Sequence, residues 1–464
     1  MVSPIVLLAI LIAGGLILTG SRSRALAAFL GAALLIPTDQ VLLLGPAHFP
    51  MLRVLIIFGA IRMFRTKGRL LPGGWNKVDK AMVVLTLVTA AAGILLYQQW
   101  TVVIFQLGNM YSALGAYFIL RFLIRVEEDV LVVIRILVYI SLFVAIIMTY
   151  EQATGKNPIY AYLGGAHAQM YGSAAERDDR FRATGCFGHP ILAGTFGAIS
   201  LPLFVGLWWR DKKYRRLAGF GVLGAVVMAA TANSSTALLG FAGGVIGLAF
   251  WPMRNWMRPV RWTILLTLVS LHLAMKAPVW HLISRIDLAG GSSSYHRYQL
   301  INQCVLHFRD WWLVGTKSYA DWGWDMYDLS DQYVLTADTA GLIPLAAFVA
   351  MIVYGFKYVG RARRIAVGER RRELLVWALG ASLFANVVAF MGIDYFDQTI
   401  VAWYTLVVMI PVAAYSARQA VLTRKANATQ LAAAGVESEA KLQSAPTAMS
   451  LMGSELPAAQ GNAR

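Results

Sequence analysis

An arginine-rich stretch, RDDRFRATGCFGHP at 177–190, contains the first side chains whose types could do chemistry. Arg180 and Arg182 directly precede a long apolar run, and His189 and Pro190 form a turn whose proline suits the first turn of a helix. A guanidinium at such a position can bind a phosphate or diphosphate through two parallel hydrogen bonds. Arginines at a membrane rim also pair with acidic neighbours without any ligand. Composition alone gives both interpretations equal weight.

A second stretch, DWGWDMYDLSDQYVLTADTAGLIPL at 321–345, is acidic at its start and apolar at its end. If it were one helix, a single face would carry Asp321, Asp325, Asp328 and Asp331. Such a row could hold a divalent cation, but Gly323 interrupts the helix, so a metal site is the least favoured interpretation. Asp331 precedes the apolar run, where a carboxylate either caps free backbone N–H groups or serves an acceptor hydroxyl.

The elements that must position these residues are membrane helices. The chain has 464 residues, of which 58% are hydrophobic and 14% charged. Soluble domains have about 45–50% apolar and about 25% charged residues. Apolar runs long enough to cross a bilayer recur along the chain. We therefore predict an all-α polytopic bundle over 1–424, followed by a disordered cytoplasmic tail over 425–464.

The distribution of basic residues predicts the orientation of the bundle. The clusters, separated by apolar stretches, lie at Arg22/Arg24, 62–80, Arg121/Arg125, 208–216, 254–261, 357–373 and 418–425. If each faces the cytoplasm, there are about thirteen helices, with the amino end outside and the carboxyl end inside. This spread leaves no single basic patch for a nucleic acid.

Two long loops then lie outside the cytoplasm, at about 151–187 and 282–335. The second contains a helical run, SYHRYQLINQCVLHFRDWWLVG, and we expect it to fold as an ordered cap at the membrane surface. Cys186 and Cys304 have no metal-ligand spacing, and two buried free thiols are favoured over a disulfide.

Four segments resemble, in order over about 150–356, the motifs of the O-antigen ligase and polymerase superfamily. They are RATGCFGHPILAGTFGAISLPL, TANSSTALLGFAGGVIGLAF, YHRYQLINQCVLHFRDWWLVGTKSY and DQYVLTADTAGLIPLAAF. Members are GT-C-type membrane glycosyltransferases that transfer a glycan from undecaprenyl diphosphate without metal or nucleotide. The resemblance implies that Arg182, with Arg180 beside it, neutralises the leaving diphosphate. It implies that Arg297 contacts the same diphosphate or the incoming sugar.

Two positions depart from the family pattern. Ser234 and Ser235 stand where many ligases have Ser-Arg, and Ser330 and Asp331 stand where ligases have His-Asn. The histidine proposed to activate a ligase acceptor is therefore missing, although a histidine of the large loop could replace it. This departure favours a polymerase of exopolysaccharide or O-antigen repeat units over a ligase.

The sequence thus predicts an inverting glycosyltransferase in the bacterial inner membrane, with no metal and no other cofactor. Its partners would be the undecaprenyl-diphosphate-linked donor and acceptor glycans, the bilayer and a chain-length regulator. The alternatives are a ligase and, in another class, a flippase or transporter, which would place ionisable residues at mid-helix depth. The candidate residues are Arg182, Arg297 and Asp331 for catalysis, and Arg180, His189, His296 and Arg309 for substrate binding.

Overall fold

The computed structural model describes residues 2–44, 47–164, 175–177, 179–285 and 294–443. The structure is 78% helical, which confirms the predicted all-α class. The chain divides into two compact units, Met1–Ser416 and Ala417–Arg464.

The first half of the chain is a succession of helices with one small hairpin. The elements are α1 (Pro4–Thr19), α2 (Arg22–Leu35), β1 (Val41–Leu44), β2 (Ala47–Pro50), α3 (Met51–Arg65), α4 (Lys77–Tyr97), α5 (Trp100–Leu123), α6 (Glu127–Thr154) and α7 (Pro158–Leu163). The two strands are antiparallel, with Val41 opposite Pro50.

The second half begins with another hairpin and continues as helices. The elements are β3 (Ala175–Arg177), β4 (Arg180–Arg182), α9 (Pro190–Arg210), η1 (Lys212–Tyr214), α10 (Arg215–Thr231), α11 (Ser235–Ala249), η2 (Trp251–Met253), α12 (Met257–Ala274), η3 (Val279–Arg285), α13 (Ser294–Leu306), α14 (Phe308–Trp311), η4 (Tyr319–Trp322), α15 (Gln332–Ala340), α16 (Leu342–Ile365), α17 (Arg370–Ala389) and α18 (Thr399–Gln443).

Among the described residues, seven helices are long and apolar enough to cross a membrane: α4, α5, α6, α9, α16, α17 and the Thr399–Arg424 part of α18. The pair α12 and η3, bent by 93°, gives an eighth if it is one span, and α1 and α11 are shorter apolar helices. These helices mark a membrane protein. The count of about thirteen spans stays a prediction.

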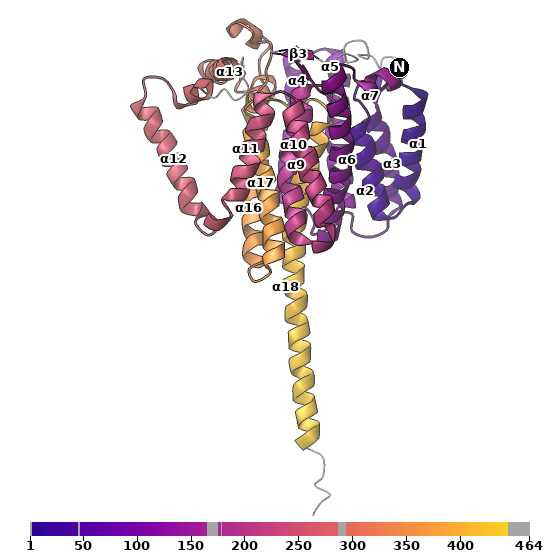
Figure 1. Ribbon diagram of the computed structural model, residues 1–464. Helices are drawn as coiled ribbons and strands as arrows, with labels where there is room; N and C mark the ends of the chain where they lie inside the picture. Colours follow the sequence, from indigo (N-terminus) through magenta and orange to yellow (C-terminus); the bar gives the residue numbers. More distant parts are fainter. Residues whose placement is uncertain (1, 45–46, 165–174, 178, 286–293, 444–464) are drawn as a thin grey trace, which may run out of the picture. The chain divides into compact units, whose positions relative to one another are not determined.

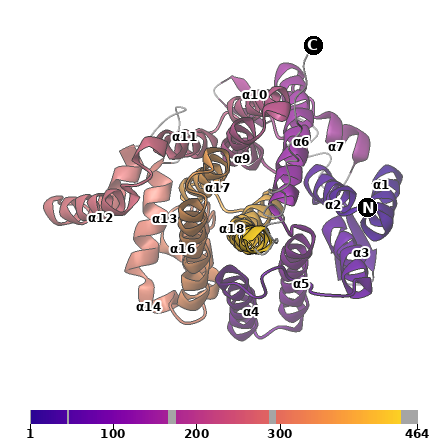
Figure 2. The same ribbon diagram turned by 90° about the horizontal axis from the view of Figure 1, so that it is seen from below.

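The centre of the first unit is the Thr399–Ser416 part of α18. Its residues from Val401 to Ala414 are buried, and Figure 2 shows it surrounded by α4, α5, α6, α9, α16 and α17. Close packing of α9 against α10 depends on Gly194, where an added Cβ would lie 2.5 Å from the Cβ of Ala232. In contrast, α12 has no buried residue.

One end of the first unit, here called the basic end, gathers the arginine clusters on a few carboxylates. Glu127 at the start of α6 pairs with Arg210 at 2.9 Å and also with Arg372. Glu373 on α17 pairs with Arg254 at 3.4 Å. The clusters that these arginines represent therefore meet at one end of the bundle, which is the arrangement that the positive-inside rule requires. Figure 1 shows α7, β3 and α13 at the opposite end.

Two further sequence predictions can be compared with the structure. Cys186 and Cys304 are both free and buried, as predicted. The tail differs from its prediction, because α18 continues as helix to Gln443 through the first part of the segment expected to be disordered. Its many Ala, Gln, Glu and Lys residues have high helix propensity, which accounts for the difference. Residues 444–464 lie outside the described part of the chain.

Candidate functional site

The segment that carries Arg182 is held by a buried carboxylate on α6. Glu151 accepts hydrogen bonds from the backbone N–H groups of Thr184 at 2.9 Å and Gly185 at 2.8 Å. The N–H of Ala183 donates to the carbonyl of Thr231, at the end of α10. These bonds fix the backbone directly after β4 and so hold Arg182 in a defined place at this end of the bundle.

Arg182 ends β4, and His189 is the N-cap of α9. The Arg182 Nε donates to the carbonyl of Ala232 at 3.4 Å, while Arg180 is exposed on β4. His189 caps α9, because its Nδ1 accepts from the N–H of Ile191 at 3.2 Å. Burial, followed by the positive charge of Arg182, lowers the pKa of His189 to about 4. The imidazole is therefore neutral near pH 7, with Nε2 carrying the hydrogen.

Arg297 on α13 joins two other segments. It is 5% exposed, and its Nη2 donates to the Thr236 hydroxyl at 2.7 Å. That hydroxyl donates in turn to the carbonyl of Gly392 at 3.1 Å. A Cβ at Gly392 would lie 3.1 Å from the Arg297 Nε, so the glycine admits the guanidinium. The first turn of α11, which contains Ser235 and Thr236, thus has the guanidinium of Arg297 against it.

Asp331 is the N-cap of α15, and only one of its two carboxylate oxygens takes part in the cap. Its Oδ1 accepts from the N–H groups of Tyr333 at 2.8 Å and Val334 at 3.0 Å. Its Oδ2 is buried and has no hydrogen-bond partner among the described residues. Burial raises the pKa of Asp331 to about 7, although the two cap bonds and the charge of Arg297 act to lower it. A general base is most effective when its pKa lies near the operating pH. Oδ1 can therefore cap the helix while Oδ2 accepts a proton.

The 391–398 loop contains two functional candidates that the sequence reasoning missed. Asp397 accepts from the N–H of Gly188 at 3.0 Å and therefore ties this loop to the segment of Arg182. Burial raises the pKa of Asp394 to about 6, and the negative charges of Asp328 and Asp397 raise it further. The charge of Asp394 in turn raises the pKa of Asp331.

The four aspartates of the 321–331 segment do not share one helical face. The 3-10 helix η4 ends at Trp322, and Asp325 has a left-handed backbone with φ of 62°. Among the described residues, no group of three or more His, Cys, Asp or Glu side chains could hold a metal ion. His296 lies near the segment, and its Nε2 donates to the carbonyl of Asp328 at 2.9 Å.

The structure does not bring Arg309 together with the other candidates. Arg309 is exposed on α14, which lies at the far end of α15, where the N–H of Leu342 donates to the carbonyl of Trp312 at 2.8 Å. Asp331 caps the other end of α15, and a nine-residue helix is about 14 Å long. His307, on the same segment as Arg309, pairs with Asp310 at 2.9 Å.

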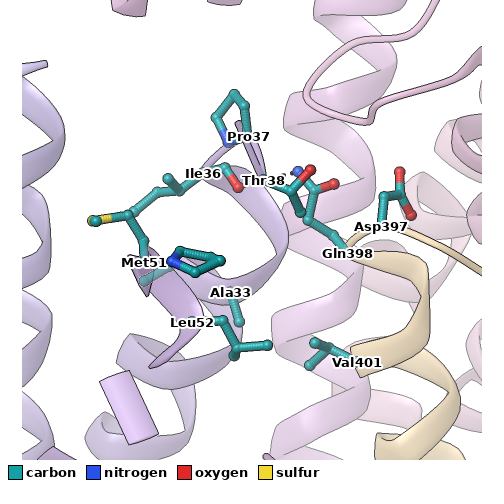
Figure 3. Close-up of a pocket in the computed structure, with 11 residues that line it drawn as sticks. Ala33, Ile36, Pro37, Thr38, Met51, Leu52, Asp397, Gln398 and Val401 are labelled. Carbon is teal, nitrogen blue, oxygen red and sulfur yellow. Dashed lines mark hydrogen bonds between the residues drawn. The ribbon is translucent and has the colours of Figure 1, made fainter. Parts of the chain in front are cut away.

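A small pocket lies behind the 391–398 loop (Figure 3). Asp397 and Gln398 line one side, and Ile36, Pro37 and Met51 line the other. Its volume of about 40 Å³ has room for a few water molecules but not for a sugar ring. Gln398 crosses this region, because its Nε2 donates to the carbonyl of Ile36 at 3.1 Å. This hydrogen bond holds the loop against the segment of Ile36. The pocket is too small to be a candidate for the substrate site.

Comparison with known proteins finds no protein family that matches the sequence and no curated protein that is significantly similar to it. What the protein does is therefore inferred from the side chains at the site and from the sequence motifs.

Proposed function

We propose that the protein is an inner-membrane glycosyltransferase that polymerises polyprenyl-diphosphate-linked glycan repeat units at the extracytoplasmic face. The observation that supports the proposal is that the segments of Arg182, Arg297 and Asp331 are all linked to the 391–398 loop. These three residues come from segments far apart in the sequence. They are linked through the 391–398 loop, because Asp397 binds the segment of Arg182 and Asp394 acts on Asp331.

The chemistry that fits these groups is an in-line displacement at an anomeric carbon. The acceptor hydroxyl oxygen forms a bond to that carbon while the bond to the diphosphate oxygen breaks, which inverts the configuration. Asp331 takes the hydroxyl proton on Oδ2, and the bond electrons leave with the diphosphate. Arg182 and Arg297 stabilise the negative charge that develops on this leaving group, where fixed charges contribute most.

The electrostatic surroundings suit Asp331 for this role. A carboxylate with the ordinary pKa of 3.8 would be a weak base toward a sugar hydroxyl. Burial and the nearby Asp394 raise its pKa, while Arg297 keeps the ionised form accessible. Asp331 can therefore bind a proton during transfer and release it again near neutral pH.

The position of the charges favours transfer over transport. A transporter would carry its unusual charges at mid-helix depth. Here Arg297 lies on α13 outside the spanning helices, Asp331 precedes α15, and Asp394 lies in a loop. A ligase would use the same donor chemistry, and it stays the nearest alternative.

The decisive experiment analyses the lipid-linked glycans of a strain that lacks the protein. Accumulation of single repeat units on the carrier supports a polymerase, and full-length polymer on the carrier indicates a ligase. Repeat units trapped at the cytoplasmic face indicate a flippase. Complementation with the wild type should restore polymer, whereas complementation with Arg297→Ala at equal abundance should not.

A further inference from the structure

The turn at 323–329 exposes aromatic side chains on a rigid base. Trp324 is 81% exposed and Tyr327 is 73% exposed. Between and after them, Met326 is 1% and Leu329 is 7% exposed, and both pack in a core cluster with Leu300 on α13. The turn is therefore well anchored, and the exposure of its aromatic rings does not result from poor packing. Large exposed apolar side chains on an ordered surface commonly mark a binding site.

This turn lies next to the candidate site. The Asp328 carbonyl accepts a hydrogen bond from His296, the residue directly before Arg297. The Asp328 charge also acts on Asp394, and Asp331 follows three residues later. Four extended residues span at most about 14 Å, so Tyr327 lies within that distance of the Asp331 backbone. A chain-like substrate that reaches Asp331 would pass close to the aromatic rings.

We propose that this turn binds the acceptor glycan. The rings of Trp324 and Tyr327 would stack against the apolar faces of its sugars, while the carboxylates of Asp325 and Asp328 accept hydrogen bonds from its hydroxyl groups. The inference rests on the proposed function and adds to it the place where the acceptor chain is held.

The charge of the surface argues for a glycan and against a lipid headgroup. Aromatic residues also anchor proteins at membrane interfaces. In this protein that pattern occurs on α12, where Trp262, 57% exposed, directly follows Arg261. The turn at Trp324 has instead the carboxylates of Asp325, which is half-buried, and Asp328, which is exposed, and both repel lipid phosphates. Hydroxyl groups without charge suit those carboxylates.

The test measures binding of an acceptor probe to the purified full-length protein. The probe is the oligosaccharide released by mild acid from the host strain's own lipid-linked repeat units. Trp324→Ala and Tyr327→Ala should each weaken its binding about tenfold, which is the range of one stacking interaction on an aromatic side chain. Trp324→Phe should keep most of the affinity, and the matched control Trp262→Ala should bind as the wild type does.

Chain length in cells gives a second measurement. Trp324→Ala should shift the polymer toward shorter chains at normal protein abundance, whereas Trp262→Ala should not. Unchanged probe affinity in both alanine variants would overturn the inference, as would quenching of Trp324 fluorescence by brominated phospholipids, which would place the ring in the bilayer. If the proposed function itself is wrong, the strain lacking the protein does not accumulate single repeat units on the carrier at the extracytoplasmic face, so the two failures are distinguishable.

Discussion

The substitution Asp331→Asn separates the cap from the charge. Asparagine caps helices about as well as aspartate. Its side-chain oxygen can accept the same bonds from Tyr333 and Val334. The change replaces only Oδ2, which is buried without a hydrogen-bond partner among the described residues, by an amide nitrogen. The cap should therefore persist, and the effects on stability and activity should come from the lost carboxylate.

The magnitude follows from the pKa of Asp331, about 7 in the folded protein against an ordinary 3.8. Because the folded state favours the protonated acid, the wild type loses stability as pH rises from 3.8 to about 7. The full loss is about 4 kcal/mol at 1.36 kcal/mol per tenfold change. The buried amide of the variant costs about 1–3 kcal/mol at every pH. We expect the Asp331→Asn variant to be the less stable protein at about pH 4, where the wild type has lost little, and the more stable one at about pH 8, where the wild type has lost the full amount.

The activity of the Asp331→Asn variant should fall even at the pH where the variant is the more stable protein. If Asp331 accepts the acceptor proton, Asp331→Asn should reduce the rate of transfer about 10²-fold or more. The assay is polymer formation in membrane vesicles from lipid-linked repeat units, with thermal unfolding measured on the same preparations. Asp321→Asn, an exposed carboxylate in the same segment, should behave as the wild type. Wild-type turnover from Asp331→Asn refutes the role of Asp331 as the general base. A stability difference between variant and wild type that is constant from pH 5 to pH 8 refutes the raised pKa of Asp331.

Three other perturbations test neighbouring parts of the reasoning. Asp394→Asn removes a negative charge that raises the pKa of Asp331, so the acidic limb of the pH–rate profile should move to lower pH. An acidic limb that does not move contradicts the coupling between Asp394 and Asp331. Arg182→Lys should reduce polymer yield nearly as much as Arg182→Ala, because lysine lacks the planar guanidinium that binds a phosphate through two hydrogen bonds. Arg309→Ala should have a mild effect. Full polymer yield from either Arg182 variant would contradict the role of Arg182 in binding the diphosphate. Alkaline phosphatase fused after Gly164 should be active and the same fusion after Lys213 inactive, and the reverse pattern would put the arginines in the wrong compartment.

The fold class could be predicted because membrane helices declare themselves by composition over each whole segment. The helical run in the large loop was likewise visible, and it appears as α13 and α14. The tail was less predictable. Low hydrophobicity argued against order there, although intrinsic helix propensity favours the helix that the structure continues to Gln443.

The site was predictable only where a residue is recognisable from its local sequence. Arg182, Arg297 and Asp331 each stand beside a helix start or a motif. Asp394 and Asp397 had a signal that went unused, since they are the only charged residues between Glu373 and Arg418.

Arg309 belongs to the same helical run of the large loop as Arg297, yet the structure does not bring it to Asp331. Its distance from Asp331 depends on the direction of α15, which no local pattern encodes. Charged residues that interrupt a long apolar stretch, as Asp394 and Asp397 do, are therefore the stronger sequence signal of a site.

The placement of Arg182 illustrates why spacing alone cannot build this site. The backbone that follows it is held at Thr184 and Gly185 by Glu151 from α6, and at Gly188 by Asp397 from the 391–398 loop. Both carboxylates accept hydrogen bonds from N–H groups of a largely buried turn, which would otherwise be left unsatisfied. Since Asp397 follows Asp394 by three residues, one loop positions the arginine segment and also sets the charge beside the proposed base. In the proposed mechanism, leaving-group stabilisation and proton acceptance are therefore coupled through a loop that contains neither catalytic candidate.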